Sequence, residues 1–146
     1  MFVLKNYPLP PSSNDLYASV RGRLVKTKMA RLYEFEVQSY KLNQHSFIEE
    51  IKNRLKDEML IVDCVFVFEK SRLISKENKL KKLDASNRLK ICHDTLAKLI
   101  EIDDKNIVKG SFMKITCEHK HEEQVIIFIS KMNKMITLDD FRRDSK

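Results

Sequence analysis

The stretch Lys82-Leu83-Asp84-Ala85-Ser86-Asn87-Arg88-Leu89-Lys90-Ile91-Cys92-His93-Asp94-Thr95-Leu96 combines an acid with an amphipathic helical pattern. At about 100° of rotation per residue, one helix face carries Asn87, Lys90, Asp94 and Lys98, and the opposite face carries Leu89, Cys92, Leu96 and Leu99. Asp84 or Ser86 can cap this helix, because a side-chain oxygen there accepts a free backbone N–H. The pattern predicts a helix with a buried leucine stripe and an exposed polar row. Two acids, Asp103 and Asp104, follow it.

This order of residues resembles the RusA family of Holliday-junction resolvases. The family carries an Asp-x-Asp-Asn-x-x-Lys-x-x-x-Asp-Ala-Leu core and an Asp-Asp pair before a strand. The matching positions here are Asp84, Asn87, Lys90, Asp94 and the pair Asp103-Asp104, and an opening Pro10-Pro11-Ser12-Ser13-Asn14 resembles the family's Pro-Pro-Ser-x-Asn. The similarity extends from about Leu4 to Ile129. One position departs from the family pattern: the second acid of Asp-x-Asp is Ser86 here.

Length and composition are those of a globular protein. A chain of 146 residues with 42% hydrophobic residues fits one domain, and no run approaches the roughly 20 apolar residues of a membrane span. We expect no signal peptide. Cys64, Cys92 and Cys117 each lie in an apolar segment, so we expect reduced, buried thiols in a cytoplasm. Only 2 glycines occur, which excludes a glycine-rich phosphate-binding loop.

The net charge of +7 favours a polyanionic partner such as nucleic acid or an anionic membrane surface, although a solvated basic surface has the same composition. Two segments concentrate the positive charge. Residues 70–82 carry Lys70, Arg72, Lys76, Lys79, Lys81 and Lys82, and an arm or short hairpin at residues 17–26 carries Arg21 and Arg23. Each segment either contacts the phosphate backbone of a nucleic acid or is a solvated loop.

The remaining pattern predicts an α+β fold. Strands are expected at residues 2–6, 60–68, 107–117 and 125–129, with a bulge at Gly110. Residues 60–68 are apolar on nearly both faces, which indicates a central strand. Thr27 and Ser46 can cap two helices, and Thr137 can cap a short C-terminal helix before a tail at residues 142–146. We therefore expect one domain over residues 1–146, with a mixed or antiparallel sheet of about four strands, two or three helices, and an extension at about 132–146.

The resemblance implies a metal site formed by Asp84 and Asp104, with Asp103 as a further ligand or neighbour. Carboxylates suit Mg²⁺, with Mn²⁺ as an alternative, and such an ion activates water and offsets the charge of a phosphodiester under attack. For the two acids to converge, the strands before and after the helix must lie side by side. Without the resemblance, Asp84 reads as a helix cap and Asp104 as a turn acid.

The resemblance also places a catalytic lysine at Lys90, where it would stabilise the charged transition state. The alternative is a solvated lysine paired with Asp94 at i,i+4. Asn87, Asp94 and Ser86 would then support the site. A neutral hydroxyl at Ser86 supplies no charge to a metal ion, so either the site tolerates the change or the protein binds junctions and cuts them poorly.

Other metal or catalytic sets are incomplete. Cys117, His119 and His121 alternate as zinc ligands could, but a fourth ligand at normal spacing is missing. His45 and His93 are isolated in the sequence and are expected to be structural.

We therefore expect a Mg²⁺-dependent endonuclease that resolves Holliday junctions or other branched DNA in recombination and repair. The resemblance implies a homodimer, since two symmetric strands are cut. It also implies a cytoplasmic protein, encoded by a bacterium or a phage, with no membrane partner and no small-molecule substrate. The alternatives are a catalytically weak or inactive branched-DNA-binding protein on the same fold, or a basic adaptor.

Overall fold

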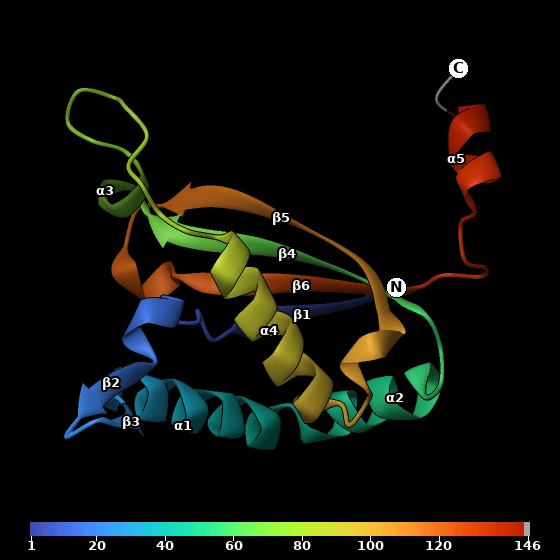
Figure 1. The fold of residues 1–146 in the computed structure, drawn as a ribbon, viewed down its shortest axis with the longest axis horizontal. Coiled ribbons are helices and arrows are strands. Elements are labelled where there is room, and N and C mark those ends of the chain that lie inside the picture. The colour runs from blue at the N-terminus through green and yellow to red at the C-terminus, as the bar shows by residue number, and fades with distance from the viewer. Residues whose placement is uncertain (145–146) are drawn as a thin grey trace.

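Three long helices lie against one face of a four-stranded mixed sheet (Figure 1). The computed structural model describes residues 1–144. The sheet strands are β1 (Phe2–Tyr7), β4 (Leu60–Glu69), β5 (Ile107–Cys117) and β6 (Gln124–Lys131), and the long helices are α1 (Lys28–Asn43), α2 (His45–Leu55) and α4 (Ser86–Leu99). Shorter elements are β2 (Tyr17–Val20), β3 (Arg23–Lys26), α3 (Lys70–Leu73), α5 (Leu138–Asp144) and the 3₁₀ turns η1 (Ser13–Asp15), η2 (Asp104–Asn106) and η3 (Lys120–Glu122).

The strand order is β1-β6-β4-β5, with β4 parallel to β5 and antiparallel to β6. Parallel neighbours need a long crossover connection, because the chain must return to the end of the sheet where it started. Helix α4 belongs to this crossover and runs back beside β4 and β5. The strands before and after the helix are therefore neighbours, as the sequence argument required.

Alternate residues of β4 form the centre of the core. Leu60, Val62, Cys64, Phe66 and Phe68 are all buried, and they belong to one cluster with apolar residues of α1, α2 and α4. Successive side chains of a strand point to opposite faces, so this set defines the face that the helices cover. The predicted α+β class and the central position of this strand are confirmed.

Several local predictions need correction. Residues 70–82 are not a simple loop: they begin with α3, and a bridge joins Ile74 to Leu80. The irregularity in β5 falls at Val108, because Leu60 pairs with Ile107 and Ile61 pairs with Lys109. Gly110 itself pairs regularly with Val62.

Two helix ends and one cysteine also differ from expectation. Helix α2 starts at His45, with Gln44 rather than Ser46 at its N-cap position. Helix α5 continues to Asp144, where a tail was predicted, and residues 145–146 lie outside the described part. Cys117 is only partly buried, because it ends the edge strand β5.

Candidate active site

The carboxylate of Asp84 organises the first turn of α4. Its Oδ1 accepts hydrogen bonds from the backbone N–H of Asn87 (3.1 Å) and the hydroxyl of Ser86 (2.9 Å), and its Oδ2 accepts one from the Asn87 side chain. These bonds, led by the Asn87 backbone N–H, lower the pKa of Asp84 below its usual value. The N-cap position itself is Ala85, and Ser86 is the first residue of α4. Asp84, one residue before the N-cap, is therefore ionised and satisfies the Asn87 N–H from outside the helix, and it is exposed to solvent.

A buried arginine fixes the backbone of residue 84. The Arg88 guanidinium donates to the carbonyl oxygens of Pro10 (3.1 Å) and Asp84 (2.8 Å), and it lies 5.5 Å from the centre of the Phe68 ring. Sequence periodicity did not identify this residue as functional or buried. The available signal was its spacing of four residues from Asp84, which places it one helical turn further on. Arg88 thus joins the proline-rich N-terminal segment to the start of α4.

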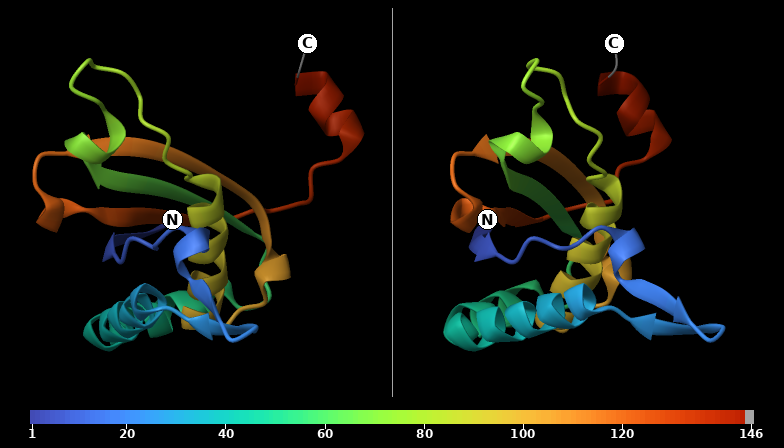
Figure 2. Two further views of the ribbon diagram at one scale, coloured as in Figure 1. Left: turned by 60° about the vertical axis from the view of Figure 1, so that its left-hand side comes forward. Right: turned by 90° about the vertical axis from the view of Figure 1, so that its left-hand side faces the viewer.

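A hollow of about 330 Å³ brings several predicted residues together. It is lined by Ser86, Leu89, Lys90, His93, Asp94, Asp104 and Ile107. Asp104 reaches this hollow because η2, which leads into β5, returns beside α4 (Figure 2). One cation and two carboxylates therefore face a shared, open space.

Two of the predicted residues lie just outside the hollow. Asp84 is not among the lining residues, but it is hydrogen-bonded to Ser86, which is. Asp103 instead caps η2, accepting from the backbone N–H of Lys105 at 3.1 Å and pairing with the Lys105 ammonium at 3.1 Å. The hydrogen bond to the Lys105 backbone is the main reason that the pKa of Asp103 is lowered.

Threonine and tyrosine hydroxyls hold the middle of α4 in place. Tyr7 of β1 donates to the Thr95 hydroxyl at 2.8 Å, and the Tyr33 hydroxyl of α1 lies 3.1 Å from the same oxygen. Thr95 in turn donates to the Ile91 carbonyl at 2.9 Å. These bonds connect β1, α1 and α4, and they fix the helix beside Asp94.

His93 was expected to be an isolated structural residue, but it packs tightly and also lines the hollow. Its Nε2 lies 3.3 Å from the Val62 carbonyl oxygen, and its ring covers Gly110 so closely that a Cβ there would lie 2.6 Å from Cε1. Burial disfavours a charged imidazole, yet the Cys64 thiol and the Val62 carbonyl raise the pKa of His93 on balance. Only glycine at position 110 allows this close approach of α4 to the sheet.

Gly110→Ala is therefore expected to lower the free energy of unfolding by about 1–3 kcal/mol, the usual cost of overpacking. The added methyl would collide with the His93 ring and with the Val62 carbonyl at 2.8 Å, and the carbonyl, which belongs to the backbone, cannot move without shifting β4. Urea unfolding measures the change. Met113→Ala, at an exposed site on the same strand, is the control and should have little effect. Equal stabilities for Gly110→Ala and the unmodified protein would contradict this packing.

The donor set fits a loosely held, hydrated cation better than a closed metal cage. Within residues 1–144, no three His, Cys, Asp or Glu side chains are close enough to enclose a metal ion. Mg²⁺ is usually held by one or two carboxylates together with waters and substrate phosphates. Asp94 and Asp104 in the hollow, with Asp84 beside Ser86, meet that requirement.

The basic segments differ in how free their side chains are. Arg72 donates to both carboxylate oxygens of Glu123 at 2.8 Å, and Lys81 donates to the Ser71 carbonyl. The other predicted cations are exposed: Lys70, Lys76, Lys79, Lys82, Arg21 and Arg23. Figure 1 shows both segments on the left-hand side of the view, with the loop after α3 at the top and the β2–β3 hairpin at the bottom.

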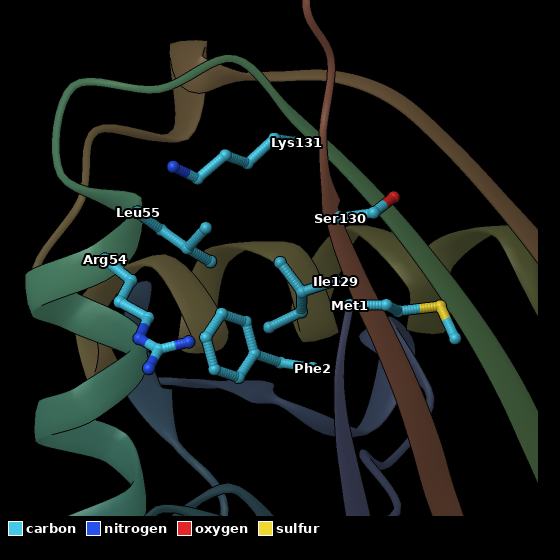
Figure 3. A pocket seen from close by; sticks show the side chains of 7 residues that line it. All are labelled: Met1, Phe2, Arg54, Leu55, Ile129, Ser130 and Lys131. Atoms are coloured by element: carbon cyan, nitrogen blue, oxygen red, sulfur yellow. The ribbon is translucent and has the colours of Figure 1, made fainter.

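A larger hollow of about 650 Å³ lies elsewhere, between β1, α2 and β6 (Figure 3). It is lined by Met1, Phe2, Arg54, Leu55, Ile129, Ser130 and Lys131, and no carboxylate is among them. The Arg54 guanidinium lies 6.0 Å from the centre of the Phe2 ring. This hollow therefore lacks the acidic groups that metal-assisted hydrolysis requires.

Comparison with known proteins identifies the family. Residues 8–130 match the family model described as endodeoxyribonuclease RusA. No curated protein matches the chain significantly. In the described part of the chain, no helix has both the length and the apolar character needed to cross a membrane. Because the match covers most of the 146 residues, the chain belongs to the RusA family of Holliday-junction resolving endonucleases.

Proposed function

We propose that this chain resolves four-way DNA junctions as a homodimer that depends on a divalent metal ion, in recombination and repair. The observation that carries the proposal is the hollow shared by Lys90, Asp94 and Asp104 beside the ionised Asp84. We propose a cytoplasmic setting in a bacterium or a phage-infected cell. We also propose that residues 132–146 are an extension of the domain, since the family match ends at residue 130.

In this proposal Asp84 and Asp104 hold Mg²⁺, or Mn²⁺ in its place. The ion, when bound, lowers the pKa of water and offsets charge on the phosphodiester. Asn87 orients Asp84 through its backbone and side-chain donors. Asp103 caps the turn that presents Asp104, so its role is to position that residue. Asp94 faces the same hollow and supports the site.

Lys90 acts on the substrate in this proposal. Its ammonium lies on the exposed face of α4, and in the described part of the chain it forms no ion pair with Asp94. A cation held at this position can stabilise the negative charge that develops on the phosphorus oxygens. Because Lys90 and Asp104 line one hollow, a scissile phosphate placed there would meet both.

Exposed cations outside the hollow bind the DNA arms. Lysines that contact phosphates supply affinity that does not depend on sequence. Lys70, Lys76, Lys79, Lys81 and Lys82 surround the loop before α4, and Arg21 and Arg23 lie on the hairpin. Arg72 contributes indirectly, because its pair with Glu123 ties α3 to the sheet.

A second candidate function is favoured by Ser86, which supplies no charge at a position where the family pattern has an acid. On this alternative the chain binds branched DNA without cutting it efficiently. Incubating labelled junction DNA with the protein, with and without Mg²⁺, distinguishes the two. We expect Mg²⁺-dependent conversion to nicked duplex, and tight junction binding with no cleavage at any Mg²⁺ concentration would favour the alternative.

Ser86→Asp is expected to lower the Mg²⁺ concentration for half-maximal cleavage by about tenfold, which corresponds to about 1.4 kcal/mol of binding free energy. Hard cations bind more tightly as the number of carboxylates rises. Without the ion, the new charge beside Asp84 should lower thermal stability slightly, and Mg²⁺ should restore it by binding the folded state. Mg²⁺ titrations of cleavage and thermal melts measure both effects, with Ser86→Asn as the uncharged control. A higher Mg²⁺ requirement would show that Ser86 is adapted to a working site.

Neutralising Lys79, Lys81 and Lys82 to Gln is expected to weaken binding to junctions and linear duplexes alike. Each lost phosphate contact should flatten the slope of log affinity against log salt by about 0.9. The matched control changes three exposed lysines away from this loop, Lys5, Lys56 and Lys134, which removes the same net charge. An unchanged salt slope in the first variant would mean that the loop does not contact DNA.

A further inference from the structure

The central strand β4 is apolar on both faces, but the three long helices lie against only one of them (Figure 1). Val62, Cys64 and Phe66 are buried on the helix-covered face. Successive side chains of a strand point to opposite faces, so Ile61 and Val65 point away from the helices. A sheet with one face in water normally has polar residues on that face. The apolar residues on the open side of β4 therefore indicate that something covers it.

The strands β6 and β1 continue this apolar surface. Ile126 of β6 pairs with Val65, and Phe128 of β6 pairs with Val3 of β1. These side chains also point away from the helices, because the alternate residues of the same strands are buried against them. We term this the outer sheet face, defined by five half-buried residues, Val3, Ile61, Val65, Ile126 and Phe128.

An acid between Ile61 and Val65 is held toward β5. The Asp63 Oδ1 accepts hydrogen bonds from the Ser111 backbone N–H at 3.0 Å and from the Ser111 hydroxyl at 2.7 Å. Ser111 lies on β5, on the opposite side of β4 from β6. The β6 and β1 side of the outer sheet face is therefore left to its apolar side chains.

The chain carries a matching apolar segment directly after β6. Met135, Ile136 and Leu138 are exposed, with Leu138 at 63%. Figure 1 and both views of Figure 2 show α5 standing apart from the sheet and from the long helices. This segment follows residue 130, where the family match ends, so it is an addition to the matched domain.

Helix α5 has a well-formed start but is too short to be stable alone. The Thr137 hydroxyl accepts from the Asp140 backbone N–H at 3.2 Å, and the Asp140 carboxylate accepts from the Thr137 backbone N–H at 3.2 Å, which is a reciprocal cap. The helix has 7 residues, whereas isolated helices shorter than about 12–15 residues are marginal in water. Leu138 and Phe141 are three residues apart and share one side of it. A capped, short and amphipathic helix needs an apolar surface to pack against.

We infer that residues 132–144 fold back over the outer sheet face of the same chain, so that Leu138 packs against Ile126 and Phe128. The backbone N–H of Met132 donates to the Met59 carbonyl at 2.9 Å, which holds the chain to the sheet up to that point. Residues 133–137 form no helix or strand and provide the hinge. Closure then turns the chain back along β6.

The dimensions of the segment fit the face. The residues between Lys131 and Leu138 can span about 20 Å when extended. Ile126 lies about 17 Å back along β6 from Lys131, at about 3.4 Å per residue. Helix α5 is about 10 Å long, and the distance across β1, β6 and β4 is also about 10 Å, because neighbouring strands are about 4.8 Å apart. The segment therefore reaches the outer sheet face and covers its width.

The tether favours this segment over a separate molecule. A short flexible linker gives an attached segment an effective concentration in the millimolar range, without any need for a second chain. The inference goes beyond the proposed function and does not rest on it, because the residues of the outer sheet face and of the segment lie outside the hollow of Lys90, Asp94 and Asp104.

Hydrogen exchange of the full chain, followed by mass spectrometry, tests the docking. The amides of residues 139–144 should exchange about tenfold or more slowly than in a synthetic peptide of residues 132–146, because a docked helix opens rarely. Leu138→Glu should abolish this protection while β4 and α4 keep theirs. Leu80→Glu, at an exposed leucine in another segment, is the matched control and should leave α5 protected. Unprotected α5 amides in the unmodified chain would overturn the inference.

Changes on the sheet test where the segment docks. Val65→Thr and Ile126→Thr make the outer sheet face more polar but keep β-branched side chains, which strands accommodate. Each should raise the exchange rate of the α5 amides while the α4 amides keep their protection, which shows that the domain is still folded. Val25→Thr, on the β2–β3 hairpin, is the matched control and should leave α5 unchanged. Full protection of α5 in both sheet variants would overturn the inference.

Dilution distinguishes the chain's own segment from that of another copy. Protection of α5 should stay constant over about a hundredfold dilution, because a tethered contact does not depend on protein concentration. Protection that falls on dilution would show that a separate molecule supplies the contact, and it would refute the inference. Junction cleavage is measured separately: an active nuclease with unprotected α5 refutes the docking alone, and protected α5 without cleavage refutes the proposed function alone.

Discussion

Asp104→Asn should reduce junction cleavage by about 10³-fold or more while junction binding survives. The change removes one negative charge at nearly constant shape from the hollow that also contains Lys90 and Asp94. A metal ion at such a site provides several kcal/mol of transition-state stabilisation, and each 1.36 kcal/mol corresponds to about tenfold in rate. Binding should be equal or slightly tighter, because a carboxylate no longer repels the phosphates. Single-turnover cleavage and gel-shift titration measure the two quantities separately.

The adjacent residue provides a matched control. Asp103→Asn removes the same charge one position earlier. Asp103, however, is outside the hollow, and its carboxylate is hydrogen-bonded to the Lys105 backbone and paired with the Lys105 ammonium. Its loss should destabilise the η2 turn and lower activity far less. If the two variants were equally impaired, the turn as a whole would matter, and Asp104 would have no special role. Cleavage by Asp104→Asn at the unmodified rate would refute its assignment as a metal ligand.

Much of the fold could be predicted because the signals are local. The apolar run at residues 60–68 identified β4, since a strand surrounded by neighbours needs little polar surface. Thr27 was recognised as a cap, and its hydroxyl accepts from the Ala30 backbone N–H at 3.1 Å. The leucine stripe of α4 was predicted from periodicity, and Cys92, Leu96 and Leu99 are buried.

The features that were missed depend on contacts between distant parts of the chain. Nothing near Arg88 in the sequence indicates that the residue will be only 5% exposed, or that its guanidinium will donate a hydrogen bond to the Pro10 carbonyl, 78 residues away. Gly110 was interpreted as a bulge from the sequence alone. The reason for a glycine there is the His93 ring packed over it, and only the folded structure shows that contact. Residues 70–82 were assigned to a loop because of their charge. Arg72 in this segment instead forms an ion pair with Glu123, which follows β5 in the chain.

The candidate site shows the same division. Periodicity placed Lys90 and Asp94 on one face of the helix, but it could not place Asp104, which depends on how η2 returns to the sheet. The resemblance to the RusA family supplied that connection, and the parallel pairing of β4 with β5 explains it physically. Periodicity alone does not distinguish Asp103 from Asp104, whereas the structure gives them different surroundings: Asp104 lines the hollow and Asp103 caps η2.

Lys90→Ala should lower the turnover of bound junction by about 10²–10³, the usual cost of removing one group that stabilises transition-state charge. Affinity should change little, because the loop and hairpin provide most of the cations that reach DNA. Lys98→Ala, two turns further along α4 and also exposed, is the matched control: it removes the same charge outside the hollow and should leave turnover unchanged.

The decisive comparison is turnover at saturating protein, since a docking residue and a catalytic residue differ only there. If the Lys90→Ala protein binds junctions more weakly but cuts bound junctions at the normal rate, then Lys90 is one of the lysines that bind DNA phosphates and has no role in turnover. If Lys90→Arg binds junctions normally but does not recover the turnover lost in Lys90→Ala, then the position of the charge matters as well as its sign. That result would agree with a requirement for a compact ammonium in the hollow that Asp94 and Asp104 also line, because the larger guanidinium distributes its charge over a plane.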